Sequence, residues 1–207
     1  NYDIEYVNGV LEVYKKSSNI VITAPTDSKE YDGTELTATK DGVEITGVPE
    51  GYTVVIDEVT GGATNTYDEG TTTVTVWHIV DENGEDVTDQ FDIDDITVEP
   101  GKITITPAPL TITAASDSKE YDGTALTNDD YTVDGLKGGD EVSIVTVTGS
   151  QTTVGFGDNI PSDAEFEDPD KIKNYDIEYV NGVLEVYKKS SNIVITAPTD
   201  SKEYDGT

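Results

Sequence analysis

Carboxylates are the side chains of this sequence best suited to hold a metal ion. The densest run is Asp163-Ala-Glu-Phe-Glu-Asp-Pro-Asp170. Its candidate ligands are Asp163, Glu165, Glu167, Asp168 and Asp170. Oxygen ligands of this kind suit Ca²⁺, although the spacing is not that of an EF-hand. We expect the run 163–170 to be the Ca²⁺ candidate and expect no other cofactor, because the second acidic run, 81–86, has the pattern of a hairpin turn at Asn83-Gly84.

Two lysines recur at one position of a short motif, Lys29 and Lys119. A buried lysine beside an asparagine and an acid can form an intramolecular isopeptide bond. Asn1 or Asn174 would be the partner, although the corresponding residue elsewhere in the chain is Gln90. The alternative is an exposed strand lysine that discourages pairing at a sheet edge.

Catalytic side chains are scarce. The chain has no cysteine and a single histidine, His78, next to the single tryptophan, Trp77. His78 has no serine or aspartate at a recognisable catalytic spacing, and no glycine-rich loop opens a helix to bind phosphate. We therefore expect no catalytic residues and no enzymatic activity.

The motif that carries the two lysines is SKEYDGT, at 28–34, 118–124 and 201–207, each time after an apolar strand. Asp-Gly favours a turn in which glycine adopts a positive φ, and the tyrosine ring is expected to face the core. A ligand site shared by Tyr and Asp is the alternative. The motif residues are Tyr31, Asp32, Gly33, Tyr121, Asp122 and Gly123, with Tyr204 in the last copy.

A longer repeat contains this motif. Residues 1–34 return unchanged as 174–207, a shift of 173 positions. The SKEYDGT spacings divide that period into two related domains, repeat A and repeat B. The domain boundaries are 1–17 for the closing hairpin of a preceding repeat, 18–108 for repeat A, 109–190 for repeat B and 191–207 for the opening strand of a following repeat.

The closing segment of repeat B has a strong hairpin pattern. Asn181-Gly182 separates two strands at 175–180 and 183–187, and Asn-Gly favours a two-residue type I′ turn. The alternation predicts one apolar face across both strands. That face contains Tyr175, Ile177, Tyr179, Leu184 and Val186.

Composition points to an all-β protein with an unusual charge. Thr, Val, Ile and Tyr dominate the ordered stretches, and Gly, Asp and Asn separate them. We expect tandem small antiparallel β domains in an elongated array, immunoglobulin-like sandwiches first and β-grasp-like domains second. The net charge of −31 repels phosphate backbones and anionic lipid, which argues against nucleic-acid and membrane-surface binding. No apolar run is long enough to span a membrane.

The strand followed by SKEYDGT, the Val-Thr-Gly tripeptides at 59–61 and 147–149, and NYDIEYVNGVLEV at 174–186 resemble the YDG/MBG-type repeats of bacterial surface proteins. Repeat A departs from the pattern at 90–105, where the Asn-Gly turn is absent. The resemblance implies a secreted, wall-anchored parent protein of a Gram-positive bacterium, with the array as its stalk. It brings no catalytic residues.

Two functions follow as hypotheses. The first is a non-catalytic extracellular spacer that projects a distal adhesive domain and whose partners are neighbouring repeats of the same chain. The second is a binding module that engages host glycan or protein through many weak contacts. Exposed aromatic residues such as Tyr14, Tyr67 and Tyr187 would serve the second.

Overall fold

The structure is a computed structural model that describes residues 2–191 and 193–206. The all-β prediction is confirmed, since the regular elements of this part of the chain are strands and four short 3-10 helices. None of these helices is long and apolar enough to cross a membrane. The chain divides into two compact units. Unit 1 comprises Asn1–Leu110, Gly135–Ser143 and Glu165–Ile177, and unit 2 comprises Thr111–Asp134, Ile144–Ala164 and Glu178–Thr207.

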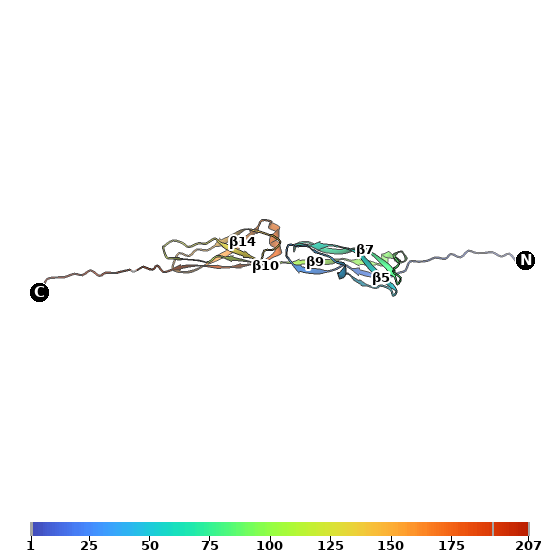
Figure 1. The fold of residues 1–207 in the computed structure, drawn as a ribbon, viewed down its shortest axis with the longest axis horizontal. Coiled ribbons are helices and arrows are strands. Elements are labelled where there is room, and N and C mark those ends of the chain that lie inside the picture. The colour runs from blue at the N-terminus through green and yellow to red at the C-terminus, as the bar shows by residue number, and fades with distance from the viewer. Residues whose placement is uncertain (1, 192, 207) are drawn as a thin grey trace. The chain divides into compact units, whose positions relative to one another are not determined.

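Unit 1 contains the first nine strands, arranged in two main sheets with the orders β4-β1-β8 and β2-β9-β7-β5 (Figure 1). A two-stranded ribbon, β3-β6, accompanies them. The strands are β1 (Val21–Thr23), β2 (Asp27–Glu30), β3 (Leu36–Thr37), β4 (Glu44–Thr46), β5 (Tyr52–Thr60), β6 (Gly62–Ala63), β7 (Thr71–Asp81), β8 (Thr97–Glu99) and β9 (Gly101–Thr106). The 3-10 helices are η1 (Lys40–Gly42), η2 (Thr88–Gln90) and η3 (Ile93–Asp95).

The core of unit 1 lies between its two sheets. β5 and β7 form the longest antiparallel pair, and their Val- and Thr-rich alternation puts Val54 opposite Ile79, both buried. These side chains pack in one cluster with residues of β1 and with Phe91. Two sheets that share one apolar core make a β-sandwich. The cluster consists of Ile20, Ile22, Ala24, Val54, Val74, Ile79, Val87 and Phe91.

Two neighbouring segments of unit 1 cross from the first sheet to the second side by side. One segment contains β1 and β2, and the other contains β8 and β9. β1 pairs in parallel with β8 in the first sheet, and their continuations β2 and β9 pair in parallel in the second. At the crossing, a Cβ on Gly101 would stand 2.4 Å from the carbonyl oxygen of Ala24 and 2.2 Å from that of Pro25. The sheets are therefore mixed rather than purely antiparallel as expected, because strands far apart in sequence can pair in parallel.

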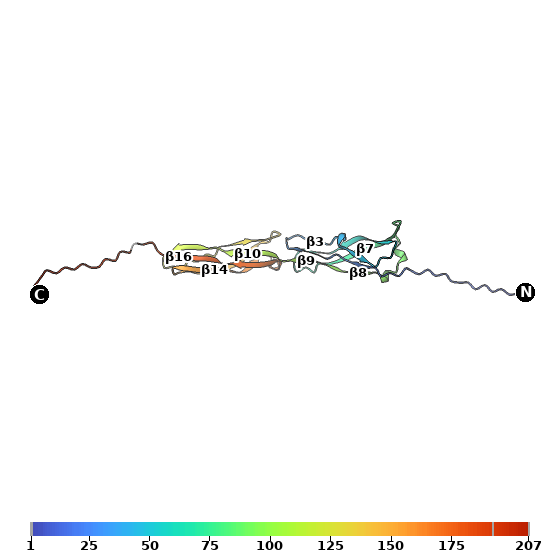
Figure 2. The ribbon, with the colours of Figure 1, turned by 90° about the horizontal axis from the view of Figure 1, so that it is seen from below.

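Unit 2 and the strands that run into it form two further sheets, with the orders β12-β10-β15 and β11-β16-β14-β13. β14 and β16 run antiparallel side by side, and β11 pairs in parallel with β16 (Figure 2). The long β14 is followed by the short helix η4, which begins at Pro169. The elements are β10 (Ala108–Ala114), β11 (Asp117–Glu120), β12 (Tyr131–Asp134), β13 (Val142–Thr148), β14 (Gly155–Phe166), η4 (Pro169–Asn174), β15 (Tyr175–Val180) and β16 (Gly182–Tyr187).

The predicted hairpin at Asn181-Gly182 is wrong. β15 and β16 lie in different sheets, so the residues between them form a sheet-crossing corner and not a type I′ turn. Gly182 does not have a positive φ. A Cβ on it would stand 2.6 and 2.3 Å from the carbonyl oxygens of Ala114 and Ala115, as at Gly101. The backbone of Ala114 and Ala115 therefore leaves no room for a side chain at position 182.

The alternation within this segment is partly as predicted. Leu184 and Val186 are buried, and Tyr175 is 7% exposed, whereas Tyr179 is 38% exposed. The hydroxyl of Tyr179 accepts a hydrogen bond from the backbone N–H of Ala164.

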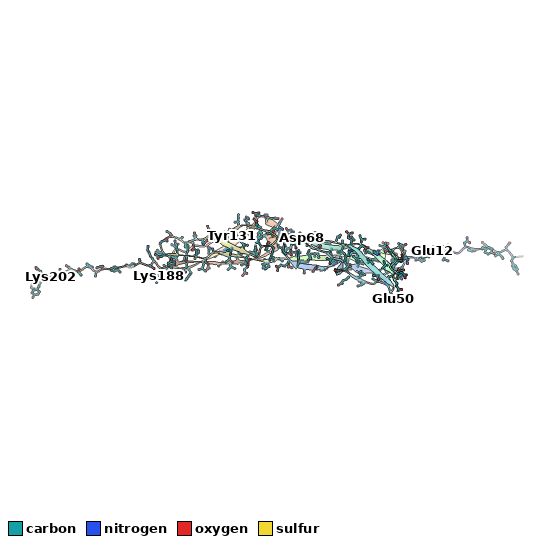
Figure 3. All side chains as sticks on the ribbon, viewed as in Figure 1. Glu12, Glu50, Asp68, Tyr131, Lys188 and Lys202 are labelled. Atoms are coloured by element: carbon teal, nitrogen blue, oxygen red, sulfur yellow. The ribbon has the colours of Figure 1, made fainter. Side chains whose placement is uncertain are left out.

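Both terminal segments lack strands. Residues 2–15 copy 175–188, yet they form no strand, and Tyr2 is 96% exposed where Tyr175 is 7% exposed. Residues 188–191 and 193–206 are likewise without strands, and Figure 3 labels Glu12 and Lys202 in the two segments. The same sequence therefore forms strands at 175–187, where it can pair with β10, β11 and β14, and none at 2–15.

Candidate functional site

The SKEYDGT turn of repeat A is held by its own side chains. Lys29 Nζ donates to Asp32 Oδ1 at 2.7 Å and to Thr34 Oγ1 at 2.6 Å. The same Asp32 oxygen accepts from the backbone N–H of Thr34 at 2.8 Å. The hydrogen bond from Lys29 and then those from Thr34 hold the pKa of Asp32 well below its usual range. The turn closes on Gly33, whose φ is +80°.

The SKEYDGT turn of repeat B has the same geometry. Lys119 Nζ lies 3.0 Å from Asp122 Oδ1 and 2.7 Å from Thr124 Oγ1. The backbone N–H of Thr124 donates to Asp122 at 2.8 Å, and this bond, with that from Lys119, lowers the pKa of Asp122. The prediction of a turn with glycine at positive φ is confirmed in both copies, since Gly123 has φ +87°.

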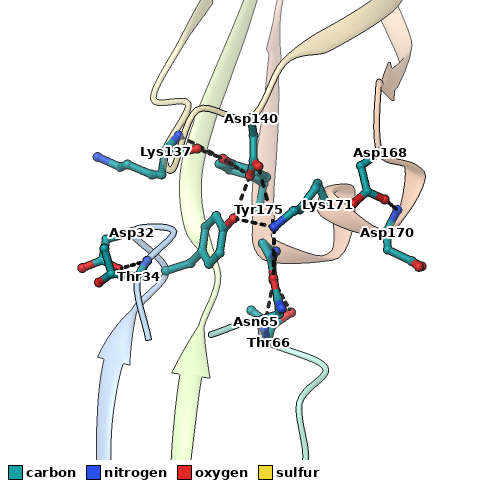
Figure 4. A network of polar contacts seen from close by, with 12 residues as sticks. Asp32, Thr34, Asn65, Thr66, Lys137, Asp140, Asp168, Asp170, Lys171 and Tyr175 are labelled. Carbon is teal, nitrogen blue, oxygen red and sulfur yellow. Dashed lines mark hydrogen bonds and ion pairs between the residues drawn. The ribbon is translucent and has the colours of Figure 1, made fainter. Parts of the chain in front are cut away.

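Figure 4 shows a polar cluster in unit 1 around Asp140, Lys171 and Tyr175. Tyr31, from the SKEYDGT turn of repeat A, belongs to this cluster. Its hydroxyl donates to Asp140 Oδ2 at 2.8 Å, and the hydroxyl of Tyr175 lies 2.9 Å from the same oxygen. The Tyr31 and Tyr175 rings meet edge to face at 5.5 Å, and Phe166 stacks on Tyr175 at 5.3 Å. The Asp140 carboxylate thus contacts the hydroxyl groups of both tyrosines, whose rings pack against each other and against Phe166.

Burial and the carboxylate act together on the two phenols. Tyr31 is 1% and Tyr175 7% exposed, and burial raises the pKa of each hydroxyl well above its ordinary value. Hydrogen bonding to Asp140 raises both further, because an ionised phenol could not donate to a carboxylate. The backbone N–H of Lys137, 2.9 Å from the Tyr175 hydroxyl, opposes this in part.

Lys171 supplies the positive charge of the cluster. Its Nζ lies 3.8 Å from Asp140 Oδ1 and 3.3 Å from the Tyr31 hydroxyl, and it donates to Asn65 Oδ1 at 3.3 Å. The Asp140 side chain is 7% exposed, so its charge is paired out of water. The cation also lies 5.7 Å from the Tyr31 ring centre.

Asn174 connects the cluster to the loop that follows β6. Its buried side-chain carbonyl accepts from the backbone N–H of Thr66 at 2.8 Å, and its amide donates to Asn65 Oδ1 at 3.0 Å. Asp68 holds this loop by accepting from the N–H groups of Thr64 and Asn65, and those bonds lower its pKa. Figure 4 shows Asn65 and Thr66 beneath Lys171. We call Tyr31, Asn65, Asp140, Lys171, Asn174 and Tyr175 the Tyr31 cluster.

Two glycines meet next to the Tyr31 cluster. A Cβ on Gly33 would stand 2.2 Å from the Cα of Gly138, and a Cβ on Gly138 would stand 2.7 Å from the Cα of Gly33. Both residues also have positive φ. This backbone contact needs glycine on both sides.

The residues of the Ca²⁺ candidate are not brought together in the described part of the chain. In the described part of the chain no three His, Cys, Asp or Glu residues gather to hold a metal ion. Asp163 and Glu165 lie on β14, whereas Asp168 accepts from the N–H of Asp170 at the start of η4 and Asp170 pairs with Lys173 at 2.7 Å. Glu167 lies between them and donates its backbone N–H to Glu141. Strand geometry and helix capping therefore spread the carboxylates instead of focusing them.

The two lysines of the isopeptide hypothesis have other partners in the structure. Lys29 and Lys119 bind the aspartate and threonine of their own turns. Asn174 binds Asn65 and Thr66 instead. The other proposed partner, Asn1, lies outside the described residues.

The three motif tyrosines differ in exposure. Tyr31 is buried as predicted, whereas Tyr121 is 42% and Tyr204 94% exposed. Sequence reasoning missed Asp140 and Lys171, which complete the environment of Tyr31. The local signal was weak, because the residue of repeat A that corresponds to Asp140 is Tyr52.

Comparisons with known proteins support a domain assignment for part of the chain. Residues 106–182 match the YDG domain. That domain contains Asp140, Lys171 and Tyr175 of the Tyr31 cluster. Among solved structures, the chain is similar to fibronectin(III)-like modules of Clostridium thermocellum CbhA, with 12% identity, coverage of 86% of this chain and 100% of that chain, and a TM-score of 0.27. No curated protein sequence matches the chain.

Proposed function

We propose that this chain is a non-catalytic structural segment of an extracellular bacterial surface protein, in which it acts as a stalk that holds a distal binding domain away from the cell. The observation that carries the proposal is the Tyr31 cluster. It fastens the SKEYDGT turn of repeat A to Asp140, Lys171 and Tyr175 of repeat B through hydrogen bonds, an ion pair and ring packing. Successive repeats joined in this way resist bending at the joint.

Other features support the same role. The exact return of residues 1–34 at 174–207 fits an array of copies with a period of 173 residues, and the YDG domain at 106–182 lies within one such period. The net charge of −31 makes like-charged repeats repel, which favours extension over collapse.

Small-angle scattering on proteins with one, two and three copies of the 173-residue period tests the proposal. The maximum dimension is expected to grow almost linearly with copy number. A dimension that grows only as a compact particle would contradict the stalk. The same series measured in high salt separates charge repulsion from the joints, because salt screens the repulsion.

A multivalent binding module for host glycan or protein is the competing function. Tyr67 and Tyr187, two aromatic residues that the sequence indicates for this role, are 45% and 46% exposed, and Phe156 is 72% exposed. Glycan-array and host-matrix binding that strengthens with copy number would favour this function. Substitution of Phe156 by serine should then weaken binding without changing the scattering profile.

A further inference from the structure

The Tyr31 cluster contains the three kinds of side chain that an intramolecular isopeptide bond requires, which are a shielded lysine, an asparagine and an acid. They are Lys171, Asn65 and Asp140, and all three lie in unit 1 (Figure 4). Asn65 belongs to repeat A, and the other two belong to repeat B. The reaction requires an amine, an amide and a proton acceptor held in mutual contact.

The amine of Lys171 lies against the side-chain amide of Asn65. Its Nζ is 3.3 Å from Asn65 Oδ1, the oxygen bonded to the Cγ atom that the amine would attack. The same Oδ1 accepts a hydrogen bond from Asn174 Nδ2 at 3.0 Å. A donor at this oxygen stabilises the negative charge that develops there during the attack. Asn174 is fully buried and is fixed by the backbone N–H of Thr66, 2.8 Å from its Oδ1.

Asp140 is placed to take a proton from that amine. Its Oδ1 lies 3.8 Å from Lys171 Nζ, whereas its Oδ2 binds the hydroxyls of Tyr31 and Tyr175 at 2.8 and 2.9 Å. The Asp140 side chain is 7% exposed and that of Lys171 is 25% exposed. This shielding limits the access of water, so hydrolysis of the amide does not compete with the attack by the amine.

We propose that Lys171 and Asn65 form an isopeptide bond that joins repeat A to repeat B covalently. Asp140 takes one proton from the Lys171 ammonium group, and the amine attacks Asn65 Cγ. The Nζ–Cγ bond forms and the Cγ–Nδ2 bond breaks. The amide nitrogen leaves as ammonia with the second proton of the attacking amine, and no oxidant, reductant or cofactor takes part.

The bond adds a mechanical property to the two repeats. It closes the chain into a loop that runs from residue 65 to residue 171. A force that pulls on the two ends of the chain then passes through the bond, so residues 66–170 are not stretched. The inference goes beyond the proposed stalk and does not rest on it, because the bond joins the same two residues whatever the chain is for.

Intact mass spectrometry of the full chain tests the bond. The measured mass should be lower than that of the sequence by one ammonia. Trypsin should no longer cleave after Lys171, and residues 41–102 and 138–173 should appear as one branched peptide. Asn83-Gly84 can also lose ammonia by closing a succinimide. An ammonia loss carried only by unbranched peptides would therefore overturn the proposal, as would a chain at its full sequence mass.

Three substitutions assign the roles. Lys171→Arg keeps the positive charge but removes the primary amine, so the chain should have the full mass of its own sequence. Lys173→Arg is the matched control, because Lys173 pairs with Asp170 outside the cluster, and this variant should still lose one ammonia. Asp140→Asn keeps both reacting side chains but should slow the reaction about a hundredfold, because it lacks the proton acceptor. A fully bonded Asp140→Asn chain would overturn the role of Asp140.

A denaturing gel gives a second measurement that does not depend on whether the variants fold. The wild-type chain should migrate faster than Lys171→Arg, because the bond keeps the unfolded chain closed into a loop. Equal migration of the two chains would contradict the bond. The scattering series tests the stalk separately, since its outcome does not depend on the mass of the chain.

Discussion

Gly33 and Gly138 touch through their backbones, so that a Cβ on Gly33 would stand 2.2 Å from the Cα of Gly138. The two residues are more than a hundred positions apart and belong to different sequence repeats. The contact gives the glycine of the Tyr-Asp-Gly motif a second role besides its positive φ.

Gly33→Ala is expected to destabilise the protein by more than the cost of its φ. Alanine at positive φ costs about 1–2 kcal/mol, and the clash with Gly138 should add about 1–3 kcal/mol. Gly123→Ala is the matched control, because Gly123 has a similar φ of +87° and open surroundings. Urea unfolding of both variants measures the difference, and equal losses would show that the Gly33 contact contributes nothing.

Tyr31→Phe removes the hydroxyl that donates to Asp140. The loss is expected to be about 1.5–3 kcal/mol, since the acceptor is a buried carboxylate. Tyr121→Phe changes the same motif position where the ring is 42% exposed, and there we expect a change of less than about 0.5 kcal/mol. Chemical denaturation compares the two, and similar effects would contradict a special role of Asp140.

Alkaline pH should weaken the protein through Tyr31 and Tyr175. Both have pKa values raised above the ordinary 10.0 when folded, so their contribution to stability is complete below pH 10. From about pH 10 upward the unfolded chain ionises these phenols while the folded chain keeps them neutral, and the free energy of unfolding falls. Urea midpoints from pH 8 to 12 measure the slope, which should be shallower in Tyr31→Phe. An unchanged slope in that variant would show that ionisation of Tyr31 does not contribute to the loss of stability at alkaline pH.

Gly182→Ala should disrupt the corner at which β15 leads into β16. The new Cβ would stand 2.3 Å from the carbonyl oxygen of Ala115, and we expect a loss of about 1–3 kcal/mol. Gly9→Ala is the control with the same local sequence, because no heavy atom of the described residues lies within 4 Å of a Cβ there. Thermal unfolding of the two variants should differ clearly. Equal melting temperatures would show that the corner tolerates a side chain.

Local sequence predicted the strands better than their partners. The alternation that puts Leu184 and Val186 inward follows from the pleat of a single strand and is correct. The Asn181-Gly182 pair predicted a hairpin because that dipeptide favours one in isolation. The pairing was decided instead by β10, β11 and β14, which are distant in sequence.

Local sequence patterns did not predict the Tyr31 cluster either, because its residues are distant from one another in sequence. Tyr31 and Tyr121 have the same neighbours in sequence, yet one is buried and the other is not. The difference comes from Asp140 and Lys171, which no spacing rule connects to Tyr31. The turn itself was predictable, because Lys29, Asp32 and Thr34 bind one another within six residues.

The strand-free state of residues 2–15, beside the strands formed by their copy at 175–188, bears on how such a protein is synthesised. In the proposed array, the closing segment of one repeat B could complete another repeat B that lacks its own, so a growing chain would offer interchangeable segments to several acceptors. Alternation with repeat A, whose closing sequence is different, would keep identical closing segments a full period of 173 residues apart. We expect this order to lower the rate of strand exchange between adjacent domains as they leave the ribosome.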